Sequence, residues 1–407
     1  MVASIKKIQH AYFFINVSYT SSLAIFGAVF YLYLQQQGFS FLQINLFGSV
    51  FWFVNFLTEL PAGIFSDYYG RKASMILSSL IRSIGLFLLL VSRANIFMLL
   101  TASALTAIAE SLKSGTLESW ALDRIHVIDP TFDSTQLFSK DKLYLSITNL
   151  SVTFIGAQLL AKINLQLPFL LAPLFFLLNI VIVSLLMDND FNRHLQRKSN
   201  ANEYLPLSTS LLAGFKALKE NPYFFHLILA LLPLQLILSG PASQWQLFFS
   251  QKSETLITGY ISTLITLCAM LGHYLTPKIS SRFKNKLSFF ILTTSLNASA
   301  IFLTAWSRSL GLALLFFAFH IVAMASEQVY RYSILNNEIK SSHRATILST
   351  FNTLESGVTV LCFVVVGKLS DQFSLSISWM ICSILLLIFA LPLFIHLMKN
   401  DHFKKTS

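Results

Sequence analysis

The segment Gly63-Ile64-Phe65-Ser66-Asp67-Tyr68-Tyr69-Gly70-Arg71-Lys72 lies between two long apolar stretches. Each stretch has about the 20 residues that a helix needs to cross a bilayer. Within the segment, Gly63 would permit close helix packing and Gly70 a tight turn. Asp67 offers an anion beside the cations of Arg71 and Lys72. We therefore expect two membrane-spanning helices joined by a short, charged loop.

The composition of the whole chain indicates the same environment. Of the 407 residues, 55% are hydrophobic and only 12% are charged, whereas soluble globular proteins carry about 25% charged residues. So little charge cannot coat a water-exposed body of this size, and lipid must cover much of the surface. The three cysteines lie in apolar stretches without CxxC spacing, which is typical of small core residues. No metal site and no cofactor is expected.

Apolar stretches recur along the chain and predict an all-α membrane protein with twelve spans. The expected spans are residues 12–34, 42–65, 74–91, 96–119, 143–163, 168–187, 222–249, 255–276, 287–306, 311–335, 345–367 and 376–398. They form an N-terminal six-helix bundle at 1–187 and a C-terminal six-helix bundle at 222–407. The cytoplasmic linker between them, 188–221, contains Leu and Phe at helical spacing, so it is either an amphipathic surface helix or a simple tether.

Lys and Arg are distributed unevenly between the spans, and this sets an orientation. With both termini in the cytoplasm, the inner segments carry 21 of the 29 basic residues, the outer ends carry 5, and 3 lie within spans. The positive-inside rule predicts such a bias. We expect a multi-pass protein of the cell inner membrane with cytoplasmic termini. Because the basic residues form no continuous face, the net charge of +11 does not indicate a nucleic-acid partner.

The pattern G-x-x-x-D-x-x-G-R-K, formed by Gly63, Asp67, Gly70, Arg71 and Lys72, resembles the signature between helices two and three of the major facilitator superfamily. It stands in the loop where that family carries it. The resemblance implies two pseudo-symmetric six-helix bundles with a substrate cavity between them, which work by alternating access. It also implies a monomer.

In that family, the motif Asp and Arg join an acidic residue at the end of helix four and the N-terminus of helix eleven. The matching positions here are Asp67, Arg71, Asp123 and the helix that starts near Arg344. Because a helix N-terminus carries about half a positive charge, Asp67 could latch the two halves while the outer side is open. The resemblance thus implies a conformational lock here, rather than a substrate site.

Two further stretches resemble a bacterial drug-efflux-like subgroup of the family. They are Glu59-Leu60-Pro61-Ala62-Gly63 before the motif and Ser114-Gly115-Thr116-Leu117-Glu118 in span four. Span five departs from many proton antiporters of the family, because it contains only Gly156 and no proline where they carry a Gly-Pro-Gly-Gly pattern. This departure weakens the expectation of drug–proton antiport.

Several charged residues fall inside expected spans, where a charge costs about 2.5–3.5 kcal/mol. Glu110 and Lys113 are three residues apart, and Glu327 and Arg331 are four apart, so each pair is expected to share one helix face. Such pairs either neutralise charge structurally, or contact substrate and exchange protons. Glu110 and Glu327 are our first choices for proton exchange. The full set of proton-coupling or substrate candidates is Glu59, Glu110, Lys113, Glu327, Arg331 and Glu355.

Other polar residues are expected to line the substrate cavity. Asn16, Tyr19 and Ser22 recur at a spacing of three on span one, and Gln235 lies on span seven. Arg82, which lies within span three, is expected either to snorkel toward the membrane surface or to form a structural pair.

Two transport functions fit these features. The first is proton-coupled efflux of lipophilic or amphiphilic small molecules, and the second is proton-coupled transport of one metabolite such as a siderophore, peptide or organic anion, bound through Lys113 and Arg331. A static receptor on this fold would not need Asp67 and Arg71. An enzyme is not expected, since the chain has no P-loop, HExxH, GxSxG or Cys/His metal spacing.

Overall fold

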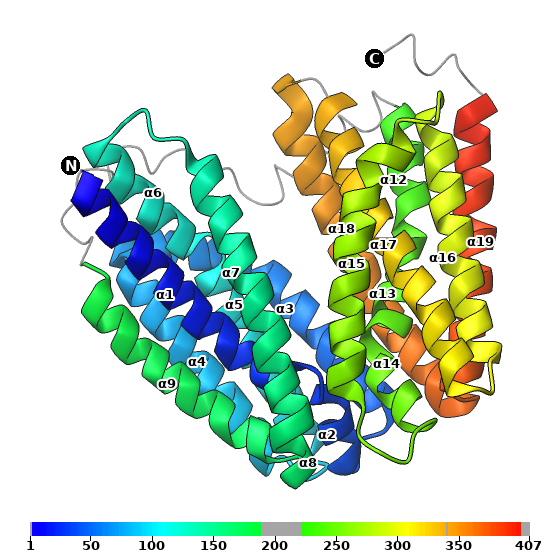
Figure 1. The fold of residues 1–407 in the computed structure, drawn as a ribbon, viewed down its shortest axis with the longest axis horizontal. Helices are drawn as coiled ribbons and strands as arrows, with labels where there is room; N and C mark the ends of the chain where they lie inside the picture. The colour runs from blue at the N-terminus through cyan, green and yellow to red at the C-terminus, as the bar shows by residue number, and fades with distance from the viewer. Residues whose placement is uncertain (1, 189–221, 339–340, 400–407) are drawn as a thin grey trace. The chain divides into compact units, whose positions relative to one another are not determined.

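The computed structural model describes residues 2–188, 222–338 and 341–399, and over these ranges the protein is helical without a strand (Figure 1). The all-α membrane class is therefore confirmed. The expected linker lies outside the described residues from residue 189 onward, so its amphipathic helix stays a prediction. The expected division of the chain into two six-helix bundles on either side of that linker also stays a prediction.

The described chain forms two compact units. The first comprises residues 2–39, 50–188 and 256–262, and the second comprises 40–49, 222–255 and 263–399 without 339–340. The first unit holds α1 (Val2–Gly27), α2 (Phe30–Gln36), α3 (Phe41–Tyr69) from Val50 onward, α4 (Arg71–Val91), α5 (Ile96–Lys113), α6 (Thr116–Ile128), α7 (Ser134–Phe154), the π-helix η1 (Ile155–Leu160), α8 (Ala161–Ile163) and α9 (Leu167–Leu186).

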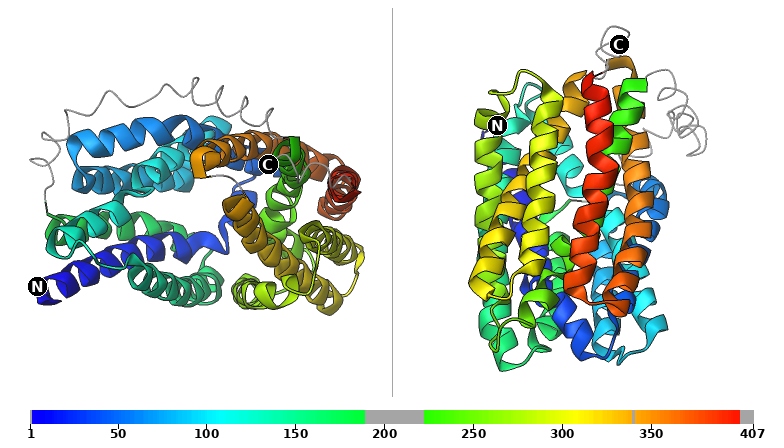
Figure 2. Two further views of the ribbon diagram at one scale, coloured as in Figure 1. Left: turned by 90° about the horizontal axis from the view of Figure 1, so that it is seen from above. Right: turned by 90° about the vertical axis from the view of Figure 1, so that its right-hand side faces the viewer.

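The second unit begins with a broken helical segment. Its helices are α12 (Pro222–Leu231), the 3₁₀ turn η3 (Leu232–Leu234), α13 (Gln235–Ser239), α14 (Pro241–Ser250), α15 (Thr258–Ser280) from Thr263 onward, α16 (Lys286–Trp306), α17 (Leu310–Glu338), α18 (Ser341–Gln372) and α19 (Leu375–Lys399). Within this unit α16 packs against both α17 and α19, and Figure 2 shows α16 and α19 side by side with their axes nearly aligned.

Ten helical segments of the described chain are long and apolar enough to cross a membrane, and the bent pair α1–α2 would make eleven. The remaining expected span, 255–276, coincides with α15. This helix carries several Thr and Tyr residues and a His, which lower its apolar character below that of the others. A multi-pass membrane protein is thus established, while the count of twelve spans and the pseudo-symmetry of the halves stay predictions.

Helix α4 illustrates how the first unit is packed. One side of it consists of small hydroxyl residues that lie against α5 and α9: the Ser74 and Ser78 hydroxyls donate to the carbonyl oxygens of Leu112 and Ala109, at 2.8 and 2.7 Å. Small side chains let helices approach closely, which is the usual basis of packing in lipid. The opposite side is exposed and apolar, as Ile84 and Phe87 show.

Helix α7 changes to π geometry where it passes α1. A Cβ on Gly156 would collide with the carbonyl oxygen of Ile25, so only glycine fits at this crossing. The start of α7 is fixed by Asp133, which accepts a hydrogen bond from the Thr135 amide at 2.8 Å. Hydrogen bonds from Thr135 lower the pKa of the Asp133 carboxyl, which lies outside the membrane spans.

The turn between α3 and α4 confirms the role expected for Gly70 and contradicts the one expected for Gly63. Gly70 has φ +95° and ψ +151°, a conformation that is essentially restricted to glycine. Gly63 is exposed, and a Cβ there would meet nothing within 4 Å, so close packing at Gly63 is not seen among the described residues. Only one of the two motif glycines is needed for the turn.

We expect Gly70→Ala to destabilise the protein by about 1–3 kcal/mol, because alanine is strained in this backbone region. Gly63→Ala is the matched control and should be neutral or slightly stabilising, since alanine is preferred to glycine within a helix. Thermal unfolding of the detergent-purified variants at one scan rate measures both. Equal midpoints for the two variants would show that the turn does not require glycine.

Candidate functional site

The motif residues anchor the ends of neighbouring helices in the first unit. Arg71 Nη1 lies 2.7 Å from Asp123 Oδ2 and donates to the carbonyl oxygen of Ser119 at 3.0 Å. Lys72 Nζ donates to the carbonyl oxygen of Ser184 at 2.7 Å. The structure therefore brings Arg71 to Asp123, and it places Asp67 exposed on the last turn of α3. The side chain of Arg344 lies outside the described residues, and a lock through it stays a prediction.

The expected ion pairs within single helices are not formed. Glu110 pairs with Arg82 of α4 instead of Lys113, and Arg331 pairs with Glu355 of α18 instead of Glu327. The physical reason is that neighbouring helices present the opposite charge directly, whereas partners one turn apart must bend toward each other along the same helix. The prediction of pairing by spacing was wrong, although the structural pairing expected for Arg82 is found.

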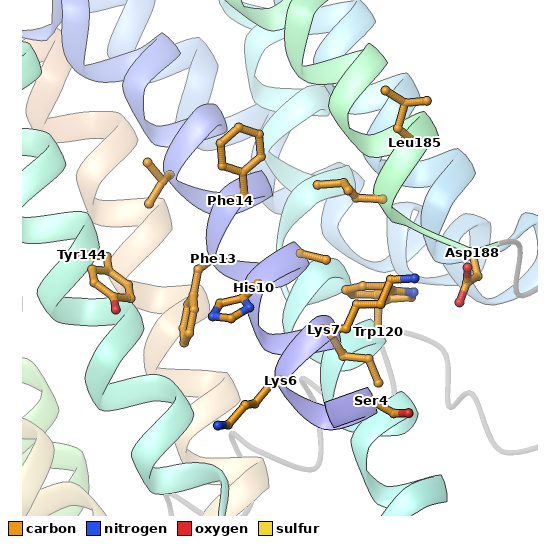
Figure 3. Close-up of a pocket in the computed structure, with 14 residues that line it drawn as sticks. Ser4, Lys6, Lys7, His10, Phe13, Phe14, Trp120, Tyr144, Leu185 and Asp188 are labelled. Atoms are coloured by element: carbon orange, nitrogen blue, oxygen red, sulfur yellow. The ribbon is translucent and has the colours of Figure 1, made fainter. Parts of the chain in front are cut away.

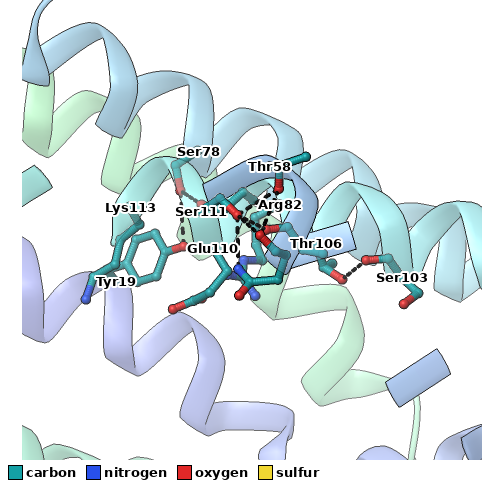
Figure 4. Close-up of polar contacts among 12 residues, drawn as sticks. Tyr19, Thr58, Ser78, Arg82, Ser103, Thr106, Glu110, Ser111 and Lys113 are labelled. Atoms are coloured by element: carbon teal, nitrogen blue, oxygen red, sulfur yellow. Dashed lines mark hydrogen bonds and ion pairs between the residues drawn. The ribbon is translucent and has the colours of Figure 1, made fainter. Parts of the chain in front are cut away.

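In the first unit these charges surround Tyr19 (Figure 4). The Tyr19 hydroxyl is 3.2 Å from Ser78 Oγ, and the cationic groups of Arg82 and Lys113 each lie 5.9 Å from the centre of its ring. Lys113 Nζ is 3.7 Å from Glu118 Oε1. Helices α1, α4, α5 and α6 thus meet in one polar network, in which each cation has a carboxylate partner.

A cavity of about 410 Å³ borders this network within the first unit. It is lined by Phe51, Trp52, Asn55, Glu59, Glu110 and Ser114. Two aromatic rings and two carboxylates therefore face the same space, and no basic residue is among the lining residues. Glu59 and Glu110, which were predicted from the sequence, are brought together here.

A second polar cluster of the first unit was missed in the sequence. Asp141 of α7 is only 5% exposed, and it accepts hydrogen bonds from the Tyr12 hydroxyl at 3.0 Å and from Asn16 Nδ2 at 2.9 Å. Among the described residues it makes no ion pair. Asp141 could not be recognised beforehand, because it stands between Lys140 and Lys142 and has the sequence context of a solvated loop.

The predicted cavity residues of α1 are buried inside the unit. Asn16 binds Asp141, Tyr19 binds Ser78, and the Ser22 hydroxyl donates to the carbonyl oxygen of Ser18 at 2.9 Å. That these side chains contact the substrate stays a prediction.

In the second unit a buried network connects α13, α17 and α18. Arg331 Nη1 lies 2.6 Å from Glu355 Oε1, and the same oxygen accepts from Gln235 Nε2 at 2.8 Å. The Thr359 hydroxyl donates to Gln235 Oε1 at 2.8 Å. The predicted residues Gln235, Arg331 and Glu355 are thus in contact with one another.

Glu327 makes no ion pair with that network among the described residues, although it lies within electrostatic reach of Arg331. Glu327 is 1% exposed, its Oε1 is 3.4 Å from the Thr294 hydroxyl, and its Oε2 has no hydrogen-bond partner among the described residues. Two turns along α17, His320 Nδ1 lies 2.6 Å from Asn297 Oδ1. Over the described part of each unit there is thus one deeply buried carboxylate without an ion pair, Asp141 in the first and Glu327 in the second.

Long apolar helices with ion pairs buried between them define a multi-pass membrane protein of the transporter type. A model of the Major Facilitator Superfamily matches residues 12–361, and the chain belongs to this family. It is an MFS-type secondary transporter that handles small molecules, and it is not an enzyme.

Known proteins similar to this chain support the family and the fold. An uncharacterised MFS-type transporter of Bacillus subtilis (strain 168), YxaM, is 28% identical over 389 residues, which are 90% of each chain. The crystal structure of the nucleoside transporter NupG has a TM-score of 0.74 at 15% identity, covering 97% of this chain and 99% of that one. A bacterial homologue of the human lysosomal transporter Spinster has a TM-score of 0.73 at 14% identity, covering 99% and 98%. At such identities the two structures share the fold alone.

The pairing in the second unit can be tested with a mutant cycle. Arg331→Gln should destabilise the protein by about 1–3 kcal/mol, because it removes the cation from the Glu355 carboxylate, whose side chain is 22% exposed. Arg331→Gln with Glu355→Gln should regain most of that loss. Arg331→Gln with Glu327→Gln is the control, and compared with Glu327→Gln alone it should still show the full loss. Unfolding in mixed detergent micelles gives the free energy of unfolding of each variant. If only the control regains stability, Arg331 pairs with Glu327 along α17 and not with Glu355.

Proposed function

We propose that this transporter exports amphiphilic organic cations in exchange for protons. The observation that carries the proposal is the cavity of the first unit, whose lining combines Phe51 and Trp52 with the carboxylates of Glu59 and Glu110. Aromatic faces attract cations and also bury apolar groups. A cavity of about 410 Å³ is within the range of small-molecule sites. This chemistry suits a ligand with a flat apolar body and a positive charge.

Proton exchange is assigned to the buried carboxylate of Glu327, with Asp141 as a second candidate. A carboxylate that lacks a cation is costly inside a membrane protein, so its proton uptake responds strongly to any change in its surroundings. Glu110 is less suitable than its position suggested, because it is engaged with Arg82. The protein would act as a monomer in the cell inner membrane with both termini in the cytoplasm, as the distribution of Lys and Arg supports.

The alternative is proton-coupled transport of one metabolite with an anionic group. That function requires Lys113 and Arg331 to bind the anion. In the described structure Arg331 is 2.6 Å from Glu355 and Lys113 is 3.7 Å from Glu118, so both cations already have partners. The paired state of these cations, beside the carboxylate of Glu59, which makes no ion pair among the described residues, favours the cation exporter. An exporter of this kind accepts many competing ligands, whereas a metabolite carrier accepts one.

Flux into proteoliposomes tests the proposed function. Vesicles with an acidic lumen should accumulate a fluorescent lipophilic cation such as ethidium faster than vesicles without a pH gradient. Glu327→Gln should remove the effect of the gradient while thermal unfolding stays unchanged. Glu254→Gln, at an exposed glutamate between α14 and α15, is the matched control and should transport normally. If pH-driven uptake is intact in both Glu327→Gln and Asp141→Asn, these carboxylates do not couple transport.

The ligand cavity is tested through its tryptophan. Trp52→Ala should raise the KM for the cation by about two- to fivefold, which corresponds to the loss of about 0.5–1 kcal/mol of cation–π attraction. Trp306→Ala, at an exposed tryptophan of the second unit, is the control and should leave the KM unchanged. An unchanged KM in Trp52→Ala would remove this cavity from the transport path.

A further inference from the structure

The first unit contains a second, larger pocket where α1 begins, and the transport proposal makes no use of it. Its volume is about 1120 Å³, and its walls come from α1, α6, α7 and the end of α9 (Figure 3). The basic start of α4 is at the same end of the unit, since Lys72 donates to the carbonyl oxygen of Ser184 near the end of α9. The pocket therefore lies where the unit gathers its positive charge.

The pocket has a basic end and an apolar end. Ser4 and Lys7 lie near the start of α1, and Figure 3 shows Lys7 on the same side of this helix as Trp120. Further along the same groove are Phe14 of α1 and Leu185 of α9. Leu185 is 77% exposed, so this wall opens toward the hydrocarbon of the membrane.

Charge in the pocket is complementary to an anion. Lys6, Lys7 and His10 line it, with Lys7 on the side of α1 that faces Trp120 and Lys6 and His10 on the other side (Figure 3), and Asp188 is the only acidic residue among the lining residues. Asp188 is 3.4 Å from Arg124 Nη2, so its charge is compensated by that ion pair. The balance at the basic end is therefore positive.

The indole N–H of Trp120 is separate evidence that this pocket binds a ligand. Trp120 lines the pocket and is only 2% exposed, yet its indole Nε1–H has no hydrogen-bond partner among the described residues. Buried polar groups are nearly always hydrogen-bonded. An acceptor oxygen brought by a ligand would satisfy this donor.

We propose that this pocket is a binding site for an acidic phospholipid. Its phosphate would lie against Lys7 and Ser4, an oxygen of its head or ester group would accept from Trp120, and an acyl chain would lie along Phe14 and Leu185. A water-soluble anion does not account for the apolar wall, and an uncharged lipophile does not account for the lysines. Juxtamembrane basic residues attract acidic lipids at the membrane surface. The proposal does not depend on what the protein transports.

The test uses the full chain in nanodiscs of equal parts phosphatidylcholine and phosphatidylglycerol, with native mass spectrometry of the lipids that stay bound. The protein should retain phosphatidylglycerol in preference. Lys7→Gln should weaken that preference about fivefold, which corresponds to about 1 kcal/mol for one lysine near the surface. Lys140→Gln is the matched control, at an exposed lysine of α7 outside the pocket, and should keep the preference.

The apolar wall is tested by Leu185→Gln, which should also lower retention of phosphatidylglycerol. Thermal unfolding of each variant shows whether it is folded. Three outcomes would overturn the proposal: no preference for phosphatidylglycerol, an equal loss in Lys7→Gln and Lys140→Gln, or full retention in Leu185→Gln. The second would indicate attraction to surface charge in general, and the third would indicate a lipid that is not seated in the pocket.

Discussion

A charge inside a bilayer has to be neutralised by a partner or hydrated by water, and this constraint organises both units. The Arg82–Glu110 pair joins α4 to α5, and the Arg331–Glu355 pair joins α17 to α18. Leaving one member of such a pair alone would cost several kcal/mol. The pairs therefore fix which helices are neighbours and how those helices are rotated, while serine hydroxyls and backbone carbonyls complete the contacts of α4.

The same constraint makes the exceptions informative. Among the described residues, Asp141 accepts hydrogen bonds from the neutral donors Tyr12 and Asn16, and Glu327 from Thr294, while the charge of Arg331 reaches Glu327 without an ion pair. Neither carboxylate has an ion pair among the described residues. Such groups destabilise the fold in their charged form, and acidic residues within membrane spans commonly belong to proton pathways, which is the reason to connect them with proton exchange. The aromatic and acidic cavity beside Glu110 provides a place for the other partner of the exchange.

Much of the fold could be predicted from the sequence, because apolar length and turn chemistry are local properties. The helices, the turn at Gly70 and the family follow from residues that are close together in the chain. The partners of the buried charges could not be predicted in this way. Spacing along a helix shows which residues share a face, but it does not show which neighbouring helix that face meets. Lys113 and Arg331 were consequently assigned the wrong acids.

Two features of α7 and the adjoining π-helix could not be predicted from the sequence, for related reasons. Asp141 is flanked by lysines that belong to the membrane surface, while its own side chain turns inward to Tyr12. Gly156 was seen only as a departure from a family pattern, although its role is the crossing with Ile25 at the π-helix. Both roles depend on contacts with α1, more than 120 residues away in the chain.

The most direct test of the account is whether binding of a cation displaces a proton from Glu327. Purified protein in weakly buffered detergent solution is mixed with the lipophilic cation, and a pH-sensitive dye records released protons. The account predicts release on binding to the natural chain and its loss in Glu327→Gln, with binding retained. Binding without proton release, or undiminished release from Glu327→Gln, would contradict it.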